Sequence, residues 1–140
     1  MVKLSSVLLV DDDPTTNFLN KLLLQTQGVA EQVLVAENGQ EALRLLAPDQ
    51  PTCAPALILL DMNMPVMNGL AFLEAYAQLP LAQQQAIVVI LLTTSIHERD
   101  LARAQQSPIA GFLDKPLNKT KLVALLHQHF PQTRPAEGAA

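Results

Sequence analysis

The chain has 140 residues and a mass of 15.2 kDa, which is enough for one compact domain and too little for two of ordinary size. Apolar residues make up 49% and charged residues 16%, which excludes a disordered, collagen-like or coiled-coil protein, and the longest strongly apolar run, Ala86 to Leu92, is too short to span a membrane. The net charge of −4 argues against a nucleic-acid partner, because binding to phosphates requires clustered Lys and Arg.

Five short apolar runs predict the strands of one sheet. Several of them are nearly continuous Val, Leu and Ile rather than alternating, as is typical of strands buried on both faces of a parallel sheet. In chain order the runs are Ser6 to Val10, Gln32 to Ala36, Ala56 to Leu60, Ala86 to Leu92 and Ile109 to Leu113.

Helix signals separate and follow these runs. Asp13 is a predicted N-cap followed by Pro14 at the first helical position, and this helix should end near Gly28. It carries an apolar stripe, which on an amphipathic helix is expected to face the sheet. The stripe consists of Phe18, Leu19, Leu22 and Leu23.

Three Asn residues predict further helix starts at Asn38, Asn68 and Asn118. A fifth helix, about Glu98 to Gln106, has the weakest apolar face. Strict alternation of strands and helices implies parallel strands joined by right-handed crossovers. We therefore predict a doubly wound α/β domain over residues 1–130, with helices on both faces of the sheet.

Three segments are expected to lie outside this regular framework. The loops Ala47 to Pro55 and Pro80 to Gln85 precede strands, at the edge opposite to the one where α/β proteins bind ligands, so we interpret them as tolerated insertions. Residues 131–140 lack periodicity and are expected to form a flexible tail.

Polar side chains follow four of the five apolar runs. Because the carboxyl ends of parallel strands meet at one edge of the sheet, these side chains should converge there. They are Asp11 to Asp13, Asp61, Thr93 to Ser95, and Asp114 with Lys115.

This set of residue types indicates phosphate chemistry. Gathered carboxylates repel one another and require a cation, and hard oxygen ligands favour Mg²⁺. A carboxylate can act as the nucleophile toward phosphorus, while a Lys ammonium and a Thr hydroxyl stabilise phosphoryl oxygens. His127 and His129 are two residues apart on a helix and do not share a face, so we do not interpret them as metal ligands.

Five segments resemble, in the same order, the receiver domain of bacterial response regulators, the chemotaxis-regulator-like family. The segments are Val7 to Asp13, Ala36 to Leu43, Leu60 to Gly69, Leu91 to Ser95 and Gly111 to Leu117. They span nearly the whole chain. The resemblance implies a flavodoxin-like fold, with a five-stranded parallel sheet in the order 2-1-3-4-5 and five flanking helices.

The resemblance also implies roles for individual residues. Asp61 matches the phosphoacceptor, Lys115 the lysine of the phosphoryl site, and Thr93 the hydroxyl that acts both in that site and in the conformational switch. Phe112 matches the aromatic switch position. Thr94 departs from the family, in which Ala or Ser is more usual, and the larger side chain could crowd an attacking water.

A Mg²⁺ site is implied in the same way. Asp12 matches a direct ligand and Asp11 a ligand acting largely through water, with Asp61 and the backbone carbonyl of Asn63 completing the set. Asp13 is an additional acid, and its role as a helix N-cap explains it at least as well as a metal role.

The resulting hypothesis is a stand-alone response regulator in a two-component phosphorelay. It would accept a phosphoryl group from a histidine kinase or a histidine phosphotransfer protein and signal to a downstream protein by contact. It would not be an enzyme in the usual sense, because it would catalyse only its own phosphorylation and dephosphorylation. A single cysteine, Cys53, and a start without a signal-peptide cleavage site favour the cytoplasm.

Two alternatives belong to other classes. A phosphohydrolase of the haloacid-dehalogenase type also gathers Asp, Thr and Lys around Mg²⁺, but that family places its nucleophile after the first strand and its acidic pair last. Here the pair Asp11 and Asp12 comes first, and there is no cap domain. A non-phosphorylated interaction module is disfavoured because all of the strand-end residues are present.

Overall fold

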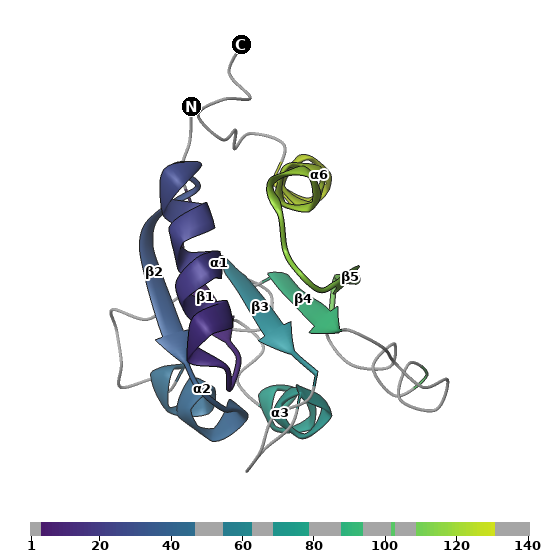
Figure 1. The fold of residues 1–140 in the computed structure, drawn as a ribbon. Helices are drawn as coiled ribbons and strands as arrows, with labels where there is room; N and C mark the ends of the chain where they lie inside the picture. The colour runs from purple at the N-terminus through teal and green to yellow at the C-terminus, as the bar shows by residue number, and fades with distance from the viewer. Residues whose placement is uncertain are drawn as a thin grey trace.

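The computed structural model describes residues 4–46, 55–62, 69–78, 88–93, 102 and 109–130 (Figure 1). The strands are β1 (Leu4–Val10), β2 (Ala30–Ala36), β3 (Leu57–Asp61), β4 (Val88–Thr93) and β5 (Gly111–Asp114). The helices in these residues are α1 (Pro14–Thr26), α2 (Gly39–Leu45), α3 (Gly69–Tyr76) and α6 (Lys119–His129).

The five strands form one sheet in the order β2-β1-β3-β4-β5, with every pair parallel (Figure 1). This confirms the predicted sheet and strand order. The strand order reverses at β1, since Val10 lies opposite Ala36 of β2 and Leu60 of β3. A crevice at the carboxyl ends of β1 and β3 is therefore the expected place for a ligand in this fold.

The core consists of two apolar layers, one on each face of the sheet, because successive strand residues point to opposite faces. On one face, Leu24 of α1 and Leu122 and Leu126 of α6 are fully buried. On the other face, the core includes Ala42 of α2 together with α3 side chains. The buried α3 side chains in that layer are Leu70, Phe72, Leu73 and Tyr76.

The helix starts follow from side-chain caps. Asp13, Asn38 and Asn118 each accept a hydrogen bond from a backbone N–H in the first turn of α1, α2 and α6, respectively. α1 ends at Thr26, and Gly28 follows with a φ of 63°, a left-handed conformation that glycine adopts without strain. The predicted starts at Asp13, Asn38 and Asn118 and the predicted end of α1 are thus confirmed, while the predicted start at Asn68 lies outside the described residues.

The buried face of α1 differs from the prediction. Phe18, Leu19 and Leu22 are 65%, 55% and 46% exposed, so the expectation that they face the sheet was wrong. Leu23, the fourth residue of the stripe, is partly buried and packs against the core. The inward positions are instead Asn17 and Asn20, followed by Leu24 and Gln27. The Asn17 Nδ2 donates to the Asp11 backbone carbonyl at 2.8 Å, and this buried hydrogen bond turns the polar residues toward the sheet.

Some predictions concern residues outside the described part of the chain. The expected helix from Glu98 to Gln106 lies outside the described residues except for Ala102, so the described part contains four helices rather than the predicted five. Residues 47–54, 80–85 and 131–140 also lie outside it. In the part of the chain that is described, every helix is too short or too polar to cross a lipid bilayer.

Candidate functional site

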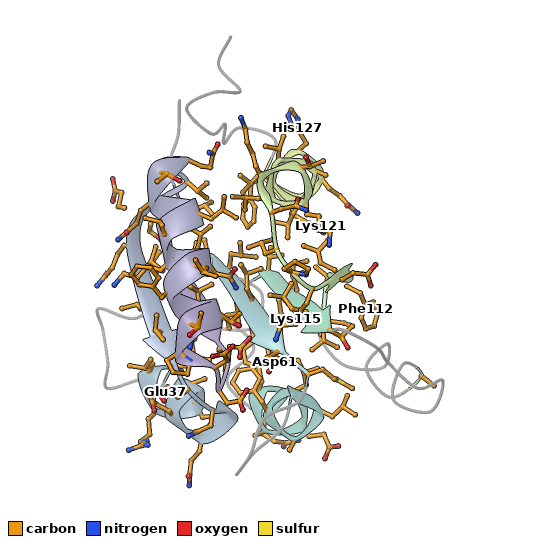
Figure 2. All side chains as sticks on the ribbon, viewed as in Figure 1. Glu37, Asp61, Phe112, Lys115, Lys121 and His127 are labelled. Atoms are coloured by element: carbon orange, nitrogen blue, oxygen red, sulfur yellow. The ribbon has the colours of Figure 1, made fainter. Side chains whose placement is uncertain are left out.

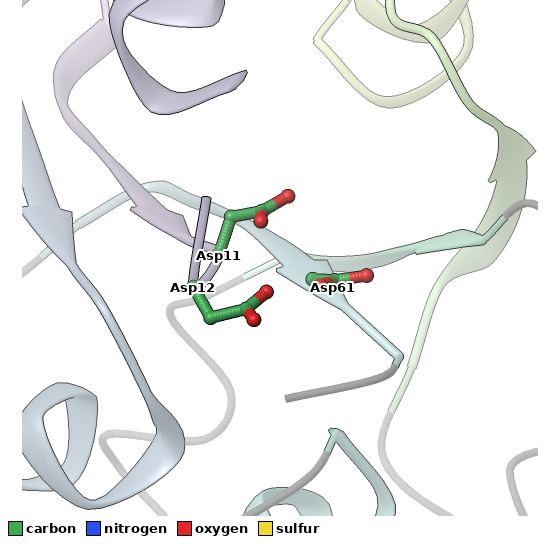
Figure 3. Close-up of side chains that lie close together, drawn as sticks. All are labelled: Asp11, Asp12 and Asp61. Carbon is green, nitrogen blue, oxygen red and sulfur yellow. The ribbon is translucent and has the colours of Figure 1, made fainter. Parts of the chain in front are cut away.

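Three carboxylates meet at the carboxyl ends of β1 and β3 (Figure 3). Asp11, Asp12 and Asp61 each offer an oxygen atom, and these atoms all lie within 4.8 Å of one another. Asp11 and Asp61 are buried, whereas Asp12 is exposed. The convergence predicted from the ends of the strands is therefore found for these acids.

Lys115 joins this cluster from the end of β5, and its side chain and that of Asp61 point toward one another in Figure 2. The Lys115 Nζ lies 2.8 Å from Asp11 Oδ2 and 3.2 Å from Asp61 Oδ1. Burial opposes the charged form of Lys115, but hydrogen bonds to Asp11 and Asp61 and their negative charges outweigh it and raise its pKa. The lysine is therefore an ammonium at neutral pH.

The formal charges of this site fit a divalent cation. Three carboxylates carry a charge of −3 and the Lys115 ammonium carries +1, which leaves −2 on four side chains. Among the described residues the cluster offers only hard oxygen donors, which at this spacing are typical of a Mg²⁺ or Ca²⁺ site rather than one for zinc.

The segment after β1 is held by hydrogen bonds of both its backbone and its side chains. The Asp11 N–H donates to the Ala36 carbonyl at 3.1 Å, and the Asp11 Oδ1 accepts from the Asp13 N–H at 2.9 Å. Asn17 holds the Asp11 carbonyl from α1. Sequence reasoning missed Asn17, although two amides at a helical spacing of three, Asn17 and Asn20, were the available signal.

Asp13 acts as a helix cap rather than as a member of the cluster. Its carboxylate accepts from the Thr16 hydroxyl at 2.7 Å and from the Thr15 N–H at 3.1 Å. These hydrogen bonds, that to Thr16 first, lower the pKa of Asp13. The interpretation of Asp13 as an N-cap is confirmed.

The end of β3 requires a glycine at the start of α3. The Gly69 N–H donates to the Met62 carbonyl at 2.9 Å, which brings the two backbones together. A Cβ atom on Gly69 would lie 2.8 Å from the Asp61 carbonyl oxygen and 3.0 Å from the Met62 Cα. Glycine at this position therefore permits the close approach that positions the Asp61 backbone.

Thr93 ends β4 at the same edge and is buried. Asp61 lies opposite Leu92, so Thr93 is one residue beyond the partner of Asp61. The Thr93 carbonyl accepts from the Lys115 N–H at 2.9 Å, which ties the lysine segment to β4.

Phe112 lies on β5 opposite Leu91, while Thr93 lies opposite Asp114. Since Thr93 and Leu91 are two residues apart on β4, Thr93 and Phe112 belong to the same face of the sheet. Phe112 is partly buried and packs against the core layer of α2 and α3. Asn63 and Thr94, which the sequence also singled out, lie outside the described residues.

A cavity of about 330 Å³ adjoins the cluster, between α1 and the segment after β5. Lys115 is one of its lining residues, so the cavity borders the lysine that contacts Asp11 and Asp61. The other lining residues are Thr16, Leu19, Asn20, Leu92, Pro116 and Leu117.

Comparison with known proteins identifies the class to which this fold and site belong. Residues 7–127 match the response regulator receiver domain, and the chain belongs to that family. It is similar to a two-component response regulator of Cytophaga hutchinsonii, whose crystal structure has 30% sequence identity and a TM-score of 0.79, with 93% of this chain and 99% of that chain covered. The resemblance inferred from the sequence is thus confirmed.

Two relatives of known sequence differ in length. The protein PilH of Pseudomonas aeruginosa is 31% identical over 125 residues, which cover 89% of this chain and 96% of PilH. The nitrate/nitrite response regulator protein NarL of Escherichia coli is 32% identical over 124 residues, which cover 89% of this chain but only 54% of NarL. The chain therefore spans almost all of one relative and about half of the other.

Proposed function

We propose that this chain, over residues 1–130, is a receiver that accepts a phosphoryl group on Asp61 and signals by protein contact. The observation that carries the proposal is the contact of Lys115 with both Asp11 and Asp61, in a cluster that also holds the Asp12 carboxylate. Membership of the receiver family supports a signalling switch over a phosphohydrolase or a purely structural interaction module.

Asp11, Asp12 and Asp61 are the side chains that would hold Mg²⁺, with the Asn63 carbonyl as the proposed additional ligand. The fit rests on three oxygen donors within 4.8 Å and on the −2 formal charge that remains after Lys115 is counted. When bound, Mg²⁺ would offset negative charge on the phosphoryl group during transfer.

The chemistry of the chain's own residues follows from their placement. An Asp61 carboxylate oxygen attacks phosphorus, forming a P–O bond as the P–N bond to the donor imidazole breaks, and the imidazole leaves with the bonding electron pair. The Lys115 ammonium already contacts Asp61 and is placed to neutralise a phosphoryl oxygen. The Thr93 hydroxyl is the proposed hydrogen-bond donor to another oxygen.

The proposed switch couples Thr93 to Phe112. The acyl phosphate carries roughly 1.5 to 2 negative charges on three acceptor oxygens beside Lys115, in place of the single charge of the Asp61 carboxylate. Movement of the Thr93 hydroxyl toward these oxygens would vacate space on the face of the sheet that Phe112 shares. Phe112 would then move inward and change the surface around β5 that a downstream protein binds.

The proposed phosphodonor is a histidine kinase or a histidine phosphotransfer protein. Any protein donor must bring its phosphoryl group to Asp61 and therefore must contact the surface beside Lys115. That surface includes Leu19, which lines the same cavity as Lys115. Phe18 and Leu22, on the same helix, are also exposed apolar side chains. We infer that the donor covers this part of α1. Leu22→Ser should then slow transfer from a protein donor and leave transfer from acetyl phosphate unchanged.

We propose a stand-alone receiver in the cytoplasm, where donors that use ATP operate. The relation to PilH, which the matched region covers almost completely, supports the stand-alone form. The relation to NarL shows that the same domain also occurs within a longer protein.

The direct test of phosphoryl transfer uses acetyl phosphate as the donor. With Mg²⁺ present, the intact mass should rise by one phosphoryl group, and an excess of EDTA should prevent this. The modified protein should lose the group on treatment with hydroxylamine, because an acyl phosphate is cleaved by this nucleophile whereas a phosphoserine is not. A hydroxylamine-stable modification would contradict the proposal.

A further inference from the structure

The Lys121 side chain holds the segment that carries Lys115. The Lys121 Nζ donates to the Asp114 carbonyl at 2.8 Å and to the Pro116 carbonyl at 3.1 Å. These carbonyls belong to the residues immediately before and after Lys115. Figure 2 shows Lys121 on α6 and Lys115 below it, nearer to Asp61.

Lys121 itself is firmly placed. Its backbone N–H donates to the Asn118 Oδ1 at 2.9 Å, which is the N-cap hydrogen bond of α6. The next residue, Leu122, is fully buried in the core layer beneath α6. The capped and packed first turn fixes the backbone from which the Lys121 side chain starts, so only its side-chain torsions have to be ordered when the ammonium binds the two carbonyls.

The segment has a second anchor on the sheet, the hydrogen bond from the Lys115 N–H to the Thr93 carbonyl. The hydrogen bonds from the Lys121 ammonium hold the segment from the side of α6. Hydrogen bonds with a charged donor are stronger than neutral ones. Together the two anchors restrain the backbone on both sides of the Lys115 Cα. The Lys115 Nζ depends on that backbone for its reach to Asp11 and Asp61.

We propose that Lys121 is a positioning residue, whose ammonium braces the Asp114 to Pro116 backbone so that the Lys115 Nζ is held against Asp61 and Asp11. The inference rests on the proposed function, because a displaced Lys115 has a functional effect only if the site carries out phosphoryl transfer, which it would then slow. Lys121 does not touch the acidic cluster in the contacts described, so it acts through the backbone and not on the reacting atoms.

The test compares Lys121→Met, Lys121→Arg and Lys119→Met in the full chain. Methionine keeps an apolar stem without the ammonium, and arginine keeps a charged donor. Lys119→Met removes the same charge from the same turn of α6 and controls for a general electrostatic effect. The rate constant for phosphorylation by acetyl phosphate, the affinity for Mg²⁺ alone and the hydrogen exchange of the Lys115 amide are measured for each.

Lys121→Met should lower the rate constant on the order of tenfold, because a small misplacement of a catalytic group is costly. It should also speed exchange of the Lys115 amide while the affinity for Mg²⁺ is not weakened, because the metal ligands lie on other strands. Lys121→Arg and Lys119→Met should stay within about twofold of wild type. General damage to the site would instead weaken Mg²⁺ binding.

Several results would overturn the inference. An unchanged rate and unchanged amide exchange in Lys121→Met would show that the ammonium does not brace the segment. An equal loss of rate in Lys119→Met would show that the effect of Lys121→Met is a general charge effect. Weakened Mg²⁺ binding in Lys121→Met would show general damage to the site. If wild type gains no phosphoryl group, the proposed function fails as well, whereas normal labelling of both wild type and Lys121→Met overturns the inference alone.

Discussion

The Lys115 ammonium lies 2.8 Å from the Asp11 carboxylate, although the two residues are 104 positions apart in the sequence. This ion pair joins the segment after β5 to the end of β1, across the carboxyl ends of β4 and β3. It places one positive charge among three carboxylates, and the formal charge of −2 that remains matches in magnitude that of a divalent cation.

Lys115→Met should destabilise the metal-free protein, because the Asp11 and Asp61 carboxylates then face each other without a counter-charge. We expect a loss of roughly 1 to 3 kcal/mol in the free energy of unfolding, less than for a fully buried pair because Lys115 is partly exposed. Saturating Mg²⁺ should reduce this loss, since the metal supplies the missing positive charge. Urea unfolding with and without Mg²⁺ measures both values, and an equal loss in the two conditions would contradict this electrostatic account.

Gly69→Ala should destabilise the fold through the close contact with the Asp61 carbonyl. The new Cβ would lie 2.8 Å from a backbone oxygen that cannot rotate away, so we expect a cost of about 1 to 3 kcal/mol. Gly111→Ala is the matched control, because its Cβ would meet only the Ile90 Cδ1 at an ordinary 3.8 Å. In thermal unfolding, Gly69→Ala should have a lower midpoint than Gly111→Ala. Similar midpoints would show that the β3–α3 junction adjusts to the added Cβ at little cost.

Tyr76 offers a pH-dependent test of the packing of α3, because it is the single tyrosine and the chain has no tryptophan. Burial raises its pKa from 10.0 to about 12, and its ring stacks on Phe72 with the centroids 5.9 Å apart. The folded state therefore disfavours the phenolate, and this contribution to stability is present below pH 10 and is lost as the pH rises toward 12. Ultraviolet absorbance should show the phenolate appearing well above pH 10 in the native protein. A midpoint near 10 in a protein that is still folded would place Tyr76 in contact with water.

Thr93→Ala tests the proposed coupling between the phosphoryl site and β5. The variant should still be phosphorylated on Asp61 but should fail to change the amide chemical shifts of Gly111, Phe112 and Leu113. Thr93→Ser retains the hydroxyl and should preserve the shift changes. Spectra recorded before and after acetyl phosphate with Mg²⁺ give the comparison. A full wild-type shift pattern in Thr93→Ala would exclude this coupling while leaving Asp61 as the acceptor.

The sequence predicts most of the framework, because strands buried on both faces are nearly continuous runs of Val, Leu and Ile. The carboxyl ends of parallel strands meet at one edge of the sheet, so the positions of Asp11 and Asp61 in the chain are enough to predict that they lie together. The orientation of α1 could not be predicted in this way. Hydrophobic periodicity favours burying Phe18 and Leu22, whereas the hydrogen bond from Asn17 to the Asp11 carbonyl depends on a contact that periodicity does not contain.

Lys121 illustrates the same limit at the candidate site. From its position in the first turn of α6, the sequence predicts only an exposed charged side chain. Its contacts with the Asp114 and Pro116 carbonyls depend on how that turn packs over the preceding segment. Residue type and spacing therefore identified the groups that do the proposed chemistry, but not the groups that hold them in place.

The central claim, that Asp61 accepts the phosphoryl group, is tested most directly by the intact mass of three proteins after treatment with acetyl phosphate and Mg²⁺. Wild type and Asp13→Asn should each gain one phosphoryl group, because Asp13 caps α1 and asparagine also serves as an N-cap. Asp61→Asn should gain none. Labelling of Asp61→Asn at the wild-type rate and to the wild-type extent would contradict the account.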